Sequence, residues 1–459
     1  MIDKVDQDNE SFGGSVQAVD RGSLFGFRNQ FLVGASWDHG QVGYQTSSEL
    51  GTFGPKFVVT GSGITLGGDD FYGRDIDTTS DYFGVFFSNT TDLTERLALT
   101  LGGRYNYARL ELDNNFVPPG EPDNLTGTHT FTRFNPNAGL TYQLAPGLTA
   151  FGGYSEANRA PTAAELSCAD PEAPCLIESL LVADPPLEQV VNRTFEIGLR
   201  GNVATFGRQH ALAWSLTGFH SRNEDDIISI AAEQSGRGYF DNVGETQRQG
   251  VEAALHYRNQ SLFTYASYSL TDATFRENLI ISAPDNPAAQ NICPDFDYDD
   301  AIEDGLGPNN AVGGGDDFEP FLPKCVSVKP GDRLPGIPRH KFKAGFDYNI
   351  TSQWKFGVDM IAASDQRFFG DEGGDNKPLP GFAKFNLHSS YDLTDKIQIY
   401  GLVDNVFDTR YGLFGTYYNS EAAEDASVSY DPDIFEDSPR RTKVPAPPVT
   451  AYGGVKVRF

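Results

Sequence analysis

The sequence contains no uninterrupted apolar run of about 18 residues, the minimum for a membrane-spanning helix, so helical membrane spans are excluded. It also has only 2 Met and 4 Cys among its 459 residues, against 34 Phe, 20 Tyr and 49 Gly. Aromatic residues favour strands and glycine favours turns. This composition therefore predicts an all-β fold.

Positive charge is scarce as well. The chain has 35 Lys and Arg against 63 Asp and Glu, a formal net charge of −28. Nucleic-acid phosphates would be repelled by such a chain, so no nucleic-acid partner is expected. Residues 1–10 are polar and acidic and lack the apolar segment of a signal peptide. We therefore expect that this chain begins inside a longer protein.

Apolar and polar residues alternate over long stretches. In 342–350 the even-numbered residues are apolar, whereas the odd-numbered ones include Lys343 and Asp347. A soluble core would not tolerate charge at mid-strand, but a water-filled lumen would, with the apolar row in lipid. The end of the chain, 447–459, alternates in the same way and stops at the aromatic Phe459. The last strand of a soluble sandwich would fit that final stretch equally well.

The lengths of the connections distinguish a membrane barrel from a soluble sandwich. Short turns rich in Thr, Asp, Asn, Pro and Gly are expected near 92–94, 145–147, 258–260, 351–353 and 394–396. Long segments alternate with them, at 113–128, 158–189, 277–338, 368–381 and 415–446. Outer-membrane barrels typically have short turns along the periplasmic rim and long loops along the extracellular rim. A soluble sandwich would distribute its loops more evenly.

We predict an all-β, antiparallel, up-and-down transmembrane β-barrel of about 16 strands that forms one domain over residues 1–459. The strands are expected at 11–20, 27–37, 39–48, 80–91, 95–112, 129–145, 148–157, 190–201, 209–228, 239–258, 261–276, 339–350, 354–367, 382–393, 396–414 and 447–459. The last of them is expected to close the sheet and to place its odd-numbered apolar residues in lipid.

Three stretches carry a family resemblance. They are Asn158-Arg-Ala-Pro-Thr-Ala-Ala-Glu-Leu, Thr194-Phe-Glu-Ile-Gly-Leu-Arg and Asp404-Asn-Val-Phe-Asp-Thr-Arg-Tyr. Together they resemble TonB-dependent outer-membrane receptors, whose penultimate strand carries a similar Asn-Leu-Phe-Asp-x-x-Tyr signature. The resemblance implies a bacterial outer-membrane location and a 22-stranded barrel. It also implies an N-terminal plug inside that barrel and gating by the inner-membrane TonB energy-coupling complex.

The chain departs from this family pattern in several respects. It shows no plug, no TonB box and only about 16 of the 22 strands, so we expect the C-terminal part of such a barrel, with the first strands also missing. The resemblance implies outer-membrane lipid and lipopolysaccharide as surroundings and a small-molecule ligand. The TonB complex would be a partner only of the intact receptor. We expect a monomer.

The leading functional hypothesis is uptake of a scarce nutrient, with a ferric siderophore first because the family uses it most. The acidic loops would slow the approach of a highly negative complex, which leaves cobalamin or a glycan as alternatives. A passive porin-like pore is a second hypothesis, and a soluble β-rich binding or glycan-acting protein is a third. No catalytic or nucleotide-binding motif is present, so neither an enzyme nor a cofactor is expected.

All four cysteines fall in the long segments that we place outside the membrane. Cys168 and Cys175 share 158–189, and Cys293 and Cys325 share 277–338. An even count in an oxidising compartment favours two local disulfides. Free thiols or a cysteine metal site are the alternatives, although no Cys-x-x-Cys pair or nearby His supports the latter.

The same long segment offers a candidate metal site. Asp295, Asp297 and Asp299 have the spacing with which an EF-hand loop opens. Position 300 is Asp where that loop needs Gly, and no helical pattern flanks it. A solvated acidic loop is therefore favoured over a surface Ca²⁺ site.

Four residues are candidates for ligand contact. Phe414, Tyr417 and Tyr418 lie where the penultimate strand leaves the membrane, so they would either floor a ligand vestibule or belong to the interfacial aromatic girdle. Arg159, within the Asn-Arg-Ala-Pro stretch, would either point at the ligand or stabilise the base of the loop.

Overall fold

The computed structural model describes residues 2–54, 59–65, 74–115, 126–162, 175–176, 187–205, 210–231, 237–283, 286–290, 293, 324–417 and 441–458. Within these ranges all regular elements are strands. No helix there is long and apolar enough to span a membrane.

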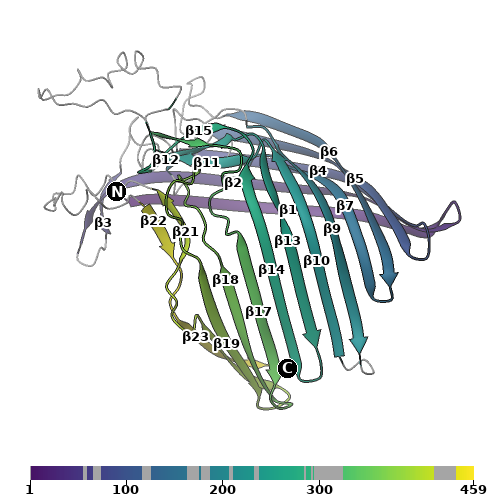
Figure 1. Cartoon of the computed structure of the whole chain (residues 1–459). Coiled ribbons are helices and arrows are strands. Elements are labelled where there is room, and N and C mark those ends of the chain that lie inside the picture. Colours follow the sequence, from purple (N-terminus) through teal and green to yellow (C-terminus); the bar gives the residue numbers. More distant parts are fainter. Residues whose placement is uncertain are drawn as a thin grey trace, which may run out of the picture.

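A single 16-stranded antiparallel sheet dominates the structure. Its strands, in spatial order, are β1 (Ile2–Leu24), β2 (Phe27–Phe53), β4 (Arg74–Asp92), β5 (Leu97–Asn114), β6 (Gly127–Ala145), β7 (Leu148–Arg159), β9 (Val190–Thr205), β10 (His210–Glu224), β13 (Thr246–Arg258), β14 (Leu262–Phe275), β17 (His340–Asn349), β18 (Trp354–Ala363), β19 (Phe382–Asp392), β20 (Ile397–Asp404) and β23 (Thr450–Val457), with β3 (Val59–Thr65) paired to β2. Figure 1 shows them as one curved wall whose short turns lie along one rim. The predicted all-β, up-and-down architecture is confirmed.

Two expectations about this sheet need correction. The predicted strands 27–37 and 39–48 are one strand, β2, because Asp38 stays in register with Gly13 of β1 and Tyr82 of β4. The predicted gap at Asp38 is therefore wrong, and its polar side chain fits the wet face of a barrel wall. The last strand also does not close the sheet: among the described strands, β23 pairs with β20 and β1 with β2, and the two ends of the sheet do not meet.

Three other predicted strands are interrupted. Residues 209–228, 239–258 and 396–414 each divide into two strands at a residue with positive φ. These residues are Asp225 (φ 53°), Gly244 (φ 68°) and Asn405 (φ 52°). At each of these three residues the left-handed backbone conformation interrupts the strand. The Asp-Asn-Val-Phe-Asp stretch therefore ends β20 instead of lying inside a long strand.

The short turns have a shared local cause. At three of them a threonine hydroxyl, on Thr94, Thr351 or Thr394, accepts hydrogen bonds from the backbone amides two and three residues ahead. Asn259 does the same with its carboxamide oxygen. Such side-chain caps fix a tight turn without a long loop, so the sequence sets the register of each hairpin locally.

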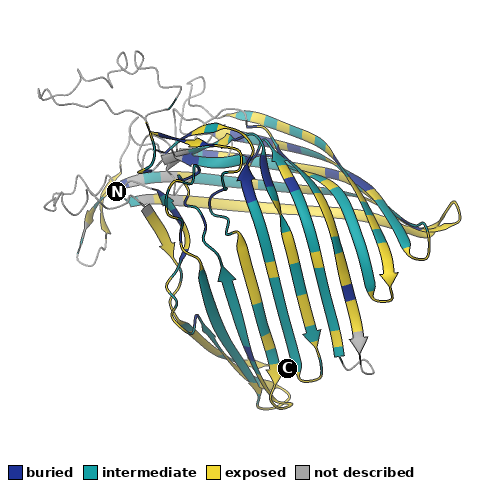
Figure 2. Cartoon of the chain, viewed as in Figure 1, coloured by how far each residue is buried: buried dark blue, intermediate teal, exposed yellow. Residues whose placement is uncertain are grey.

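The sheet has two chemically distinct faces, which the strand register defines across all ladders. One, the apolar face, carries Phe195 and Ile197 of β9, which are 58% and 73% exposed. The other, the polar face, carries Glu196 and Arg200 from the same strand. Figure 2 shows few buried residues along the middle of the strands. Exposed apolar rows of this length do not suit water, but they suit lipid.

Smaller sheets cover one end of the wall. They consist of β8 (Cys175–Leu176), β11 (Ile227–Ala231) and β12 (Arg237–Asn242); β15 (Leu279–Ser282) and β16 (Cys325–Val328); and β21 (Gly412–Tyr417) and β22 (Arg441–Pro445). The largest buried cluster lies here, around Phe275 and Val328, which are both fully buried. The apolar core therefore forms where the long connections pack against the ends of wall strands, and a second cluster contains Leu110 and Leu112 of β5.

Candidate functional site

The polar face of β14, β17, β18 and β19 carries a tight charged network. His388 lies between two carboxylates, with Nε2 2.7 Å from Asp347 and Nδ1 3.3 Å from Asp359. The Tyr265 hydroxyl donates to Asp359 at 2.6 Å. These groups come from four adjacent strands and are only partly buried, so they pair with one another on a wet surface. Both carboxylates are thereby occupied.

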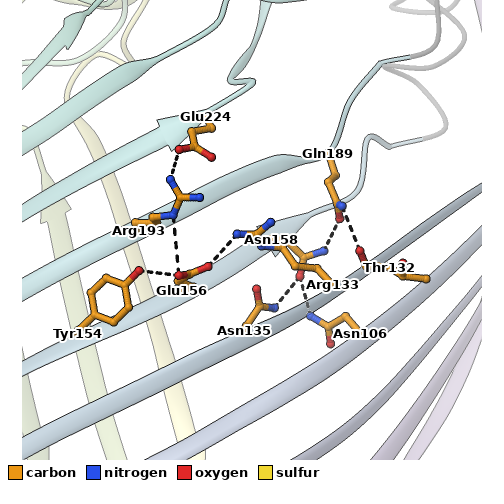
Figure 3. A network of polar contacts seen from close by, with 10 residues as sticks. All are labelled: Asn106, Thr132, Arg133, Asn135, Tyr154, Glu156, Asn158, Gln189, Arg193 and Glu224. Carbon is orange, nitrogen blue, oxygen red and sulfur yellow. Dashed lines mark hydrogen bonds and ion pairs between the residues drawn. The ribbon is translucent and has the colours of Figure 1, made fainter.

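A second network of polar side chains lies where the neighbouring strands β6 and β7 stop pairing. The ladder between β6 and β7 ends at the pair Asn137–Ser155, whereas β6 continues along β5 and β7 continues along β9. Side chains bridge the separating strands, as Figure 3 shows. We call this set the seam: Asn106, Thr132, Arg133, Asn135, Tyr154, Glu156, Asn158, Gln189, Arg193 and Glu224.

Glu156 is the charged centre of the seam. Its carboxylate accepts hydrogen bonds from Arg133 of β6 at 2.8 Å and from Tyr154 at 2.6 Å. Arg193 of β9 lies 3.8 Å away and also pairs with Glu224 of β10. One carboxylate thus ties β6, β7 and β9 together, with its negative charge compensated on two sides.

Asn158 is the neutral centre of the seam. Its carbonyl oxygen accepts from Asn106 at 2.8 Å and from Asn135 at 2.6 Å, and its amide donates to Gln189 at 2.9 Å. Gln189 in turn donates to the Thr132 backbone carbonyl. The first residue of the Asn-Arg-Ala-Pro stretch therefore joins four chain segments. Its neighbour Arg159 is exposed and closes the β7–β9 ladder opposite Val190.

A cavity of about 290 Å³ lies beside the end of β18. Its lining residues come from β17, β18, β19, β21 and the connections between them: Gly336, Pro338, Lys341, Lys343, Ile361, Ala362, Ala363, Ser364, Gln366, Pro380, Phe382, Gly412 and Leu413. The Phe382 ring stacks on Tyr411 with centroids 3.8 Å apart, and Gln366 donates to the Leu413 carbonyl at 2.7 Å. These two contacts hold the cavity walls in place.

The aromatic candidates lie near this cavity without lining it. Tyr417 is 3% exposed and packs with Phe368 and Leu379 in a small core. Phe414 is 45% exposed and meets the Phe369 ring edge-on. Tyr418 lies outside the described residues. The structure thus buries Tyr417 and leaves Phe414 accessible to a ligand.

The cysteine and metal candidates are only partly described. Cys293 and Cys325 form a disulfide across a sequence separation of 32 residues. Cys175 begins β8, but its side chain and all of Cys168 lie outside the described part of the chain. Asp295, Asp297 and Asp299 are also outside it. Among the described side chains, no group of three His, Cys, Asp or Glu could hold a metal ion.

Two buried carboxylates follow β18. Asp371 and Glu372 are 0% and 2% exposed, and Asn286 from another connection donates to the Gly370 carbonyl beside them at 2.6 Å. Asn376 donates to Asp371 at 2.7 Å, and Arg367 lies 3.8 Å from it. Burial raises the pKa of the Glu372 carboxyl to about 7 and also raises the pKa of Asp371. This cluster fastens one long connection to another.

Comparison with known proteins decides the family. The model of the TonB-dependent receptor-like β-barrel matches residues 3–406. The chain belongs to the TonB-dependent receptor family. Its members are bacterial outer-membrane receptors and transporters, so the polar face of the sheet lines a lumen and the apolar face contacts lipid.

Similar TonB-dependent receptors of known structure share the fold at low identity. The siderophore receptor PiuA from Acinetobacter baumannii has a TM-score of 0.64 at 13% identity and covers 99% of this chain and 56% of its own. The ferric yersiniabactin receptor FyuA from Yersinia pestis has a TM-score of 0.62 at 13% identity, covering 100% and 55%. This TonB-dependent receptor chain therefore spans little more than half of these structures.

Curated relatives differ in what they transport. The vitamin B12 transporter BtuB of Photobacterium profundum is 22% identical over 54% of this chain and 31% of its own length. The metal-pseudopaline receptor CntO of Pseudomonas aeruginosa is 19% identical over 72% and 37%. The chain thus spans about a third of these receptors, and their names point to different ligands.

Sequence reasoning missed the seam and the cavity. The seam depends on where the β6–β7 ladder stops, which a single sequence does not show. The cavity did have a signal: Lys341, Lys343 and Lys384 share the polar face of neighbouring strands in a chain with few cations. Alternation alone could have placed these three lysines together.

Proposed function

We propose that residues 1–459 form one barrel domain that supplies the wall of an outer-membrane receptor for TonB-dependent uptake of a ferric siderophore. The supporting observation is the partition of the 16-stranded sheet into an apolar face in lipid and a polar, hydrogen-bonded face around a lumen. A passage for a polar nutrient needs both faces.

The choice of ligand rests on the receptors that this chain resembles. PiuA and FyuA are siderophore receptors by name, and CntO is a receptor for a metal complex. BtuB makes vitamin B12 the alternative ligand. In this proposal the intact receptor is a monomer in lipid and lipopolysaccharide, carries no cofactor in its barrel, and takes energy from the TonB complex.

The test uses the full chain purified in detergent. Tryptophan fluorescence is recorded while ferric trihydroxamate, ferric citrate or cyanocobalamin is added. Saturable quenching by a ferric complex, with none by cyanocobalamin, supports the proposal. Saturation by cyanocobalamin alone moves the ligand to the B12 class. A steady open conductance in planar bilayers with no ligand binding would instead indicate a passive pore.

A further inference from the structure

Three lysines gather on the polar face beside the cavity. Lys341 and Lys343 line it from β17, and Lys384 of β19 lies on the same face, because Ile361 of β18 pairs with both Lys343 and Lys384. Strands lie about 4.8 Å apart, so the Cα atoms of Lys343 and Lys384 are about 10 Å apart. Four-carbon side chains can bring all three ammonium groups to one ligand.

These lysines form no ion pair in the described structure. Their side chains form no hydrogen bond to another described residue either. The arginines at the same end of the wall are paired, Arg333 with Asp365 at 3.3 Å and Arg339 with Asp272 at 3.2 Å.

On β17 to β19, the two carboxylates of this face nearest the lysines are already engaged. Asp347 and Asp359 bind His388, and Asp359 also accepts from Tyr265. Within β17 to β19 the lysines therefore have no free carboxylate partner near the cavity, in a chain of net charge −28. Glu252 of β13 lies opposite Lys341 across Ser269 of β14 and forms no ion pair with either partner strand in the described structure.

The rest of the cavity is apolar and small. Its walls include the apolar residues Ile361, Phe382, Pro338 and Leu413. Gln366, the lining residue with a side-chain amide, already donates that amide to the Leu413 carbonyl. A cavity of about 290 Å³ is at the lower end for small-molecule sites, which usually measure about 300–1,000 Å³. It would hold one arm of a larger ligand.

We propose that this cavity binds an oxyanion, a carboxylate or a phosphate, carried by the transported ligand, with Lys341 and Lys343 in contact and Lys384 adding to the field. This inference rests on the proposed receptor function and specifies the ligand class. It opposes the expectation from net charge alone, which favours neutral or cationic ligands. Local unpaired lysines decide recognition at contact range because salt screens the more distant loop charges within about 8–10 Å.

The experiment measures anion binding to the full chain in detergent by isothermal titration calorimetry. Citrate and inorganic phosphate are the probes, and triethyl citrate is the uncharged counterpart of citrate. The test variant is Lys341→Gln/Lys343→Gln. The matched control is Lys355→Gln, which removes a lysine from the same polar face on β18 but outside the cavity.

We expect citrate to bind the wild type and to bind the double variant about ten-fold more weakly, a loss of about 1.4 kcal/mol. The control should keep wild-type affinity, and triethyl citrate should not bind. Stronger phosphate than citrate binding would assign the oxyanion as phosphate. Equal citrate affinity in wild type and double variant, or an equal loss in Lys355→Gln, overturns the inference.

Ferric complexes separate this inference from the receptor function. If neutral ferric trihydroxamate binds but citrate and phosphate do not, the lysine site is wrong and the receptor stands. If the anions bind through the lysines while no ferric complex binds, the site stands and siderophore uptake is wrong. If nothing binds, both proposals fail.

Discussion

Arg133 donates to Glu156 at 2.8 Å across the line where β6 and β7 stop pairing. The register places the two residues on opposite faces: Arg133 pairs with Asn106 on the polar face, and Glu156 is two residues from Tyr154, which pairs with Ala138 on the apolar face. Only the opening of the sheet lets the two side chains meet. This ion pair therefore holds the wall together where the backbone ladder does not.

Removing either partner should weaken the wall at the seam. Glu156→Gln leaves Arg133 without a charged partner, and Arg133→Gln leaves Glu156 with only the more distant Arg193. We expect either change to lower the unfolding free energy by about 1–3 kcal/mol. The double variant should lose less than the sum of the two, as a double-mutant cycle in urea would show. Strictly additive losses would mean that the pair contributes nothing of its own.

The buried Glu372 gives the loop cluster a pH dependence. Its pKa in the folded protein is raised to about 7 by burial, above the ordinary value of 4.5, so the folded state holds a proton that the unfolded state releases. Stability from this group is therefore greatest below about pH 4.5 and falls as pH rises toward 7. Hydrogen exchange at 366–379 should speed up over that window in the wild type.

Glu372→Gln provides the matched control for this pH effect. A glutamine keeps the size of the side chain and does not titrate, so the change in exchange between pH 5 and 7 should shrink. If the variant and the wild type respond to pH identically, another group controls the stability of this loop.

The Cys293–Cys325 disulfide should stabilise the β15–β16 region. It joins residues 32 apart in sequence and ends on Cys325, which is 4% exposed in the loop core. Cys293→Ala/Cys325→Ala should lower the unfolding free energy by about 2–4 kcal/mol. A reducing agent should lower the urea midpoint of the wild type more than that of the variant. An equal response would place the effect on other cysteines.

A lysine introduced on the apolar face should destabilise the barrel more than a lysine introduced on the polar face. Ile197→Lys places an ammonium group on the apolar face and should cost about 2–4 kcal/mol in lipid vesicles. Glu196→Lys, one residue away on the polar face, should be tolerated. Urea-dependent refolding into vesicles, followed by heat-modified mobility on gels, measures both. Equal costs would contradict the assignment of faces.

Alternation and turn chemistry carried most of the fold prediction. Rows such as Phe342 and Phe346 against Lys343 and Asp347 fixed the two faces of β17, and Thr-capped turns fixed the hairpin positions. The small strands of the connections, such as β15, were missed. They are two to six residues long, which is too short for a two-faced pattern like that of the wall to be recognised.

Side-chain partners were harder to predict than faces. The polar face of β9 and β13 carries two acids and two arginines, Glu196, Glu252, Arg200 and Arg258, yet none of these four forms an ion pair with another described residue. The arginines instead lie over aromatic rings, Arg200 over Phe151 at 5.7 Å and Arg258 over Phe263 at 5.1 Å. Ladder register decides such contacts, and composition does not reveal it.

The most direct measurement of the two-faced wall is a nitroxide scan of β9 from Phe195 to Arg200 in lipid vesicles, on a cysteine-free background. Labels on Phe195, Ile197 and Leu199 should be relaxed by oxygen, which dissolves in lipid. Labels on Glu196, Gly198 and Arg200 should be relaxed by a water-soluble nickel complex, so accessibility should alternate with a period of two. Uniform accessibility to nickel along the strand, or alternation of the opposite phase, would contradict the account.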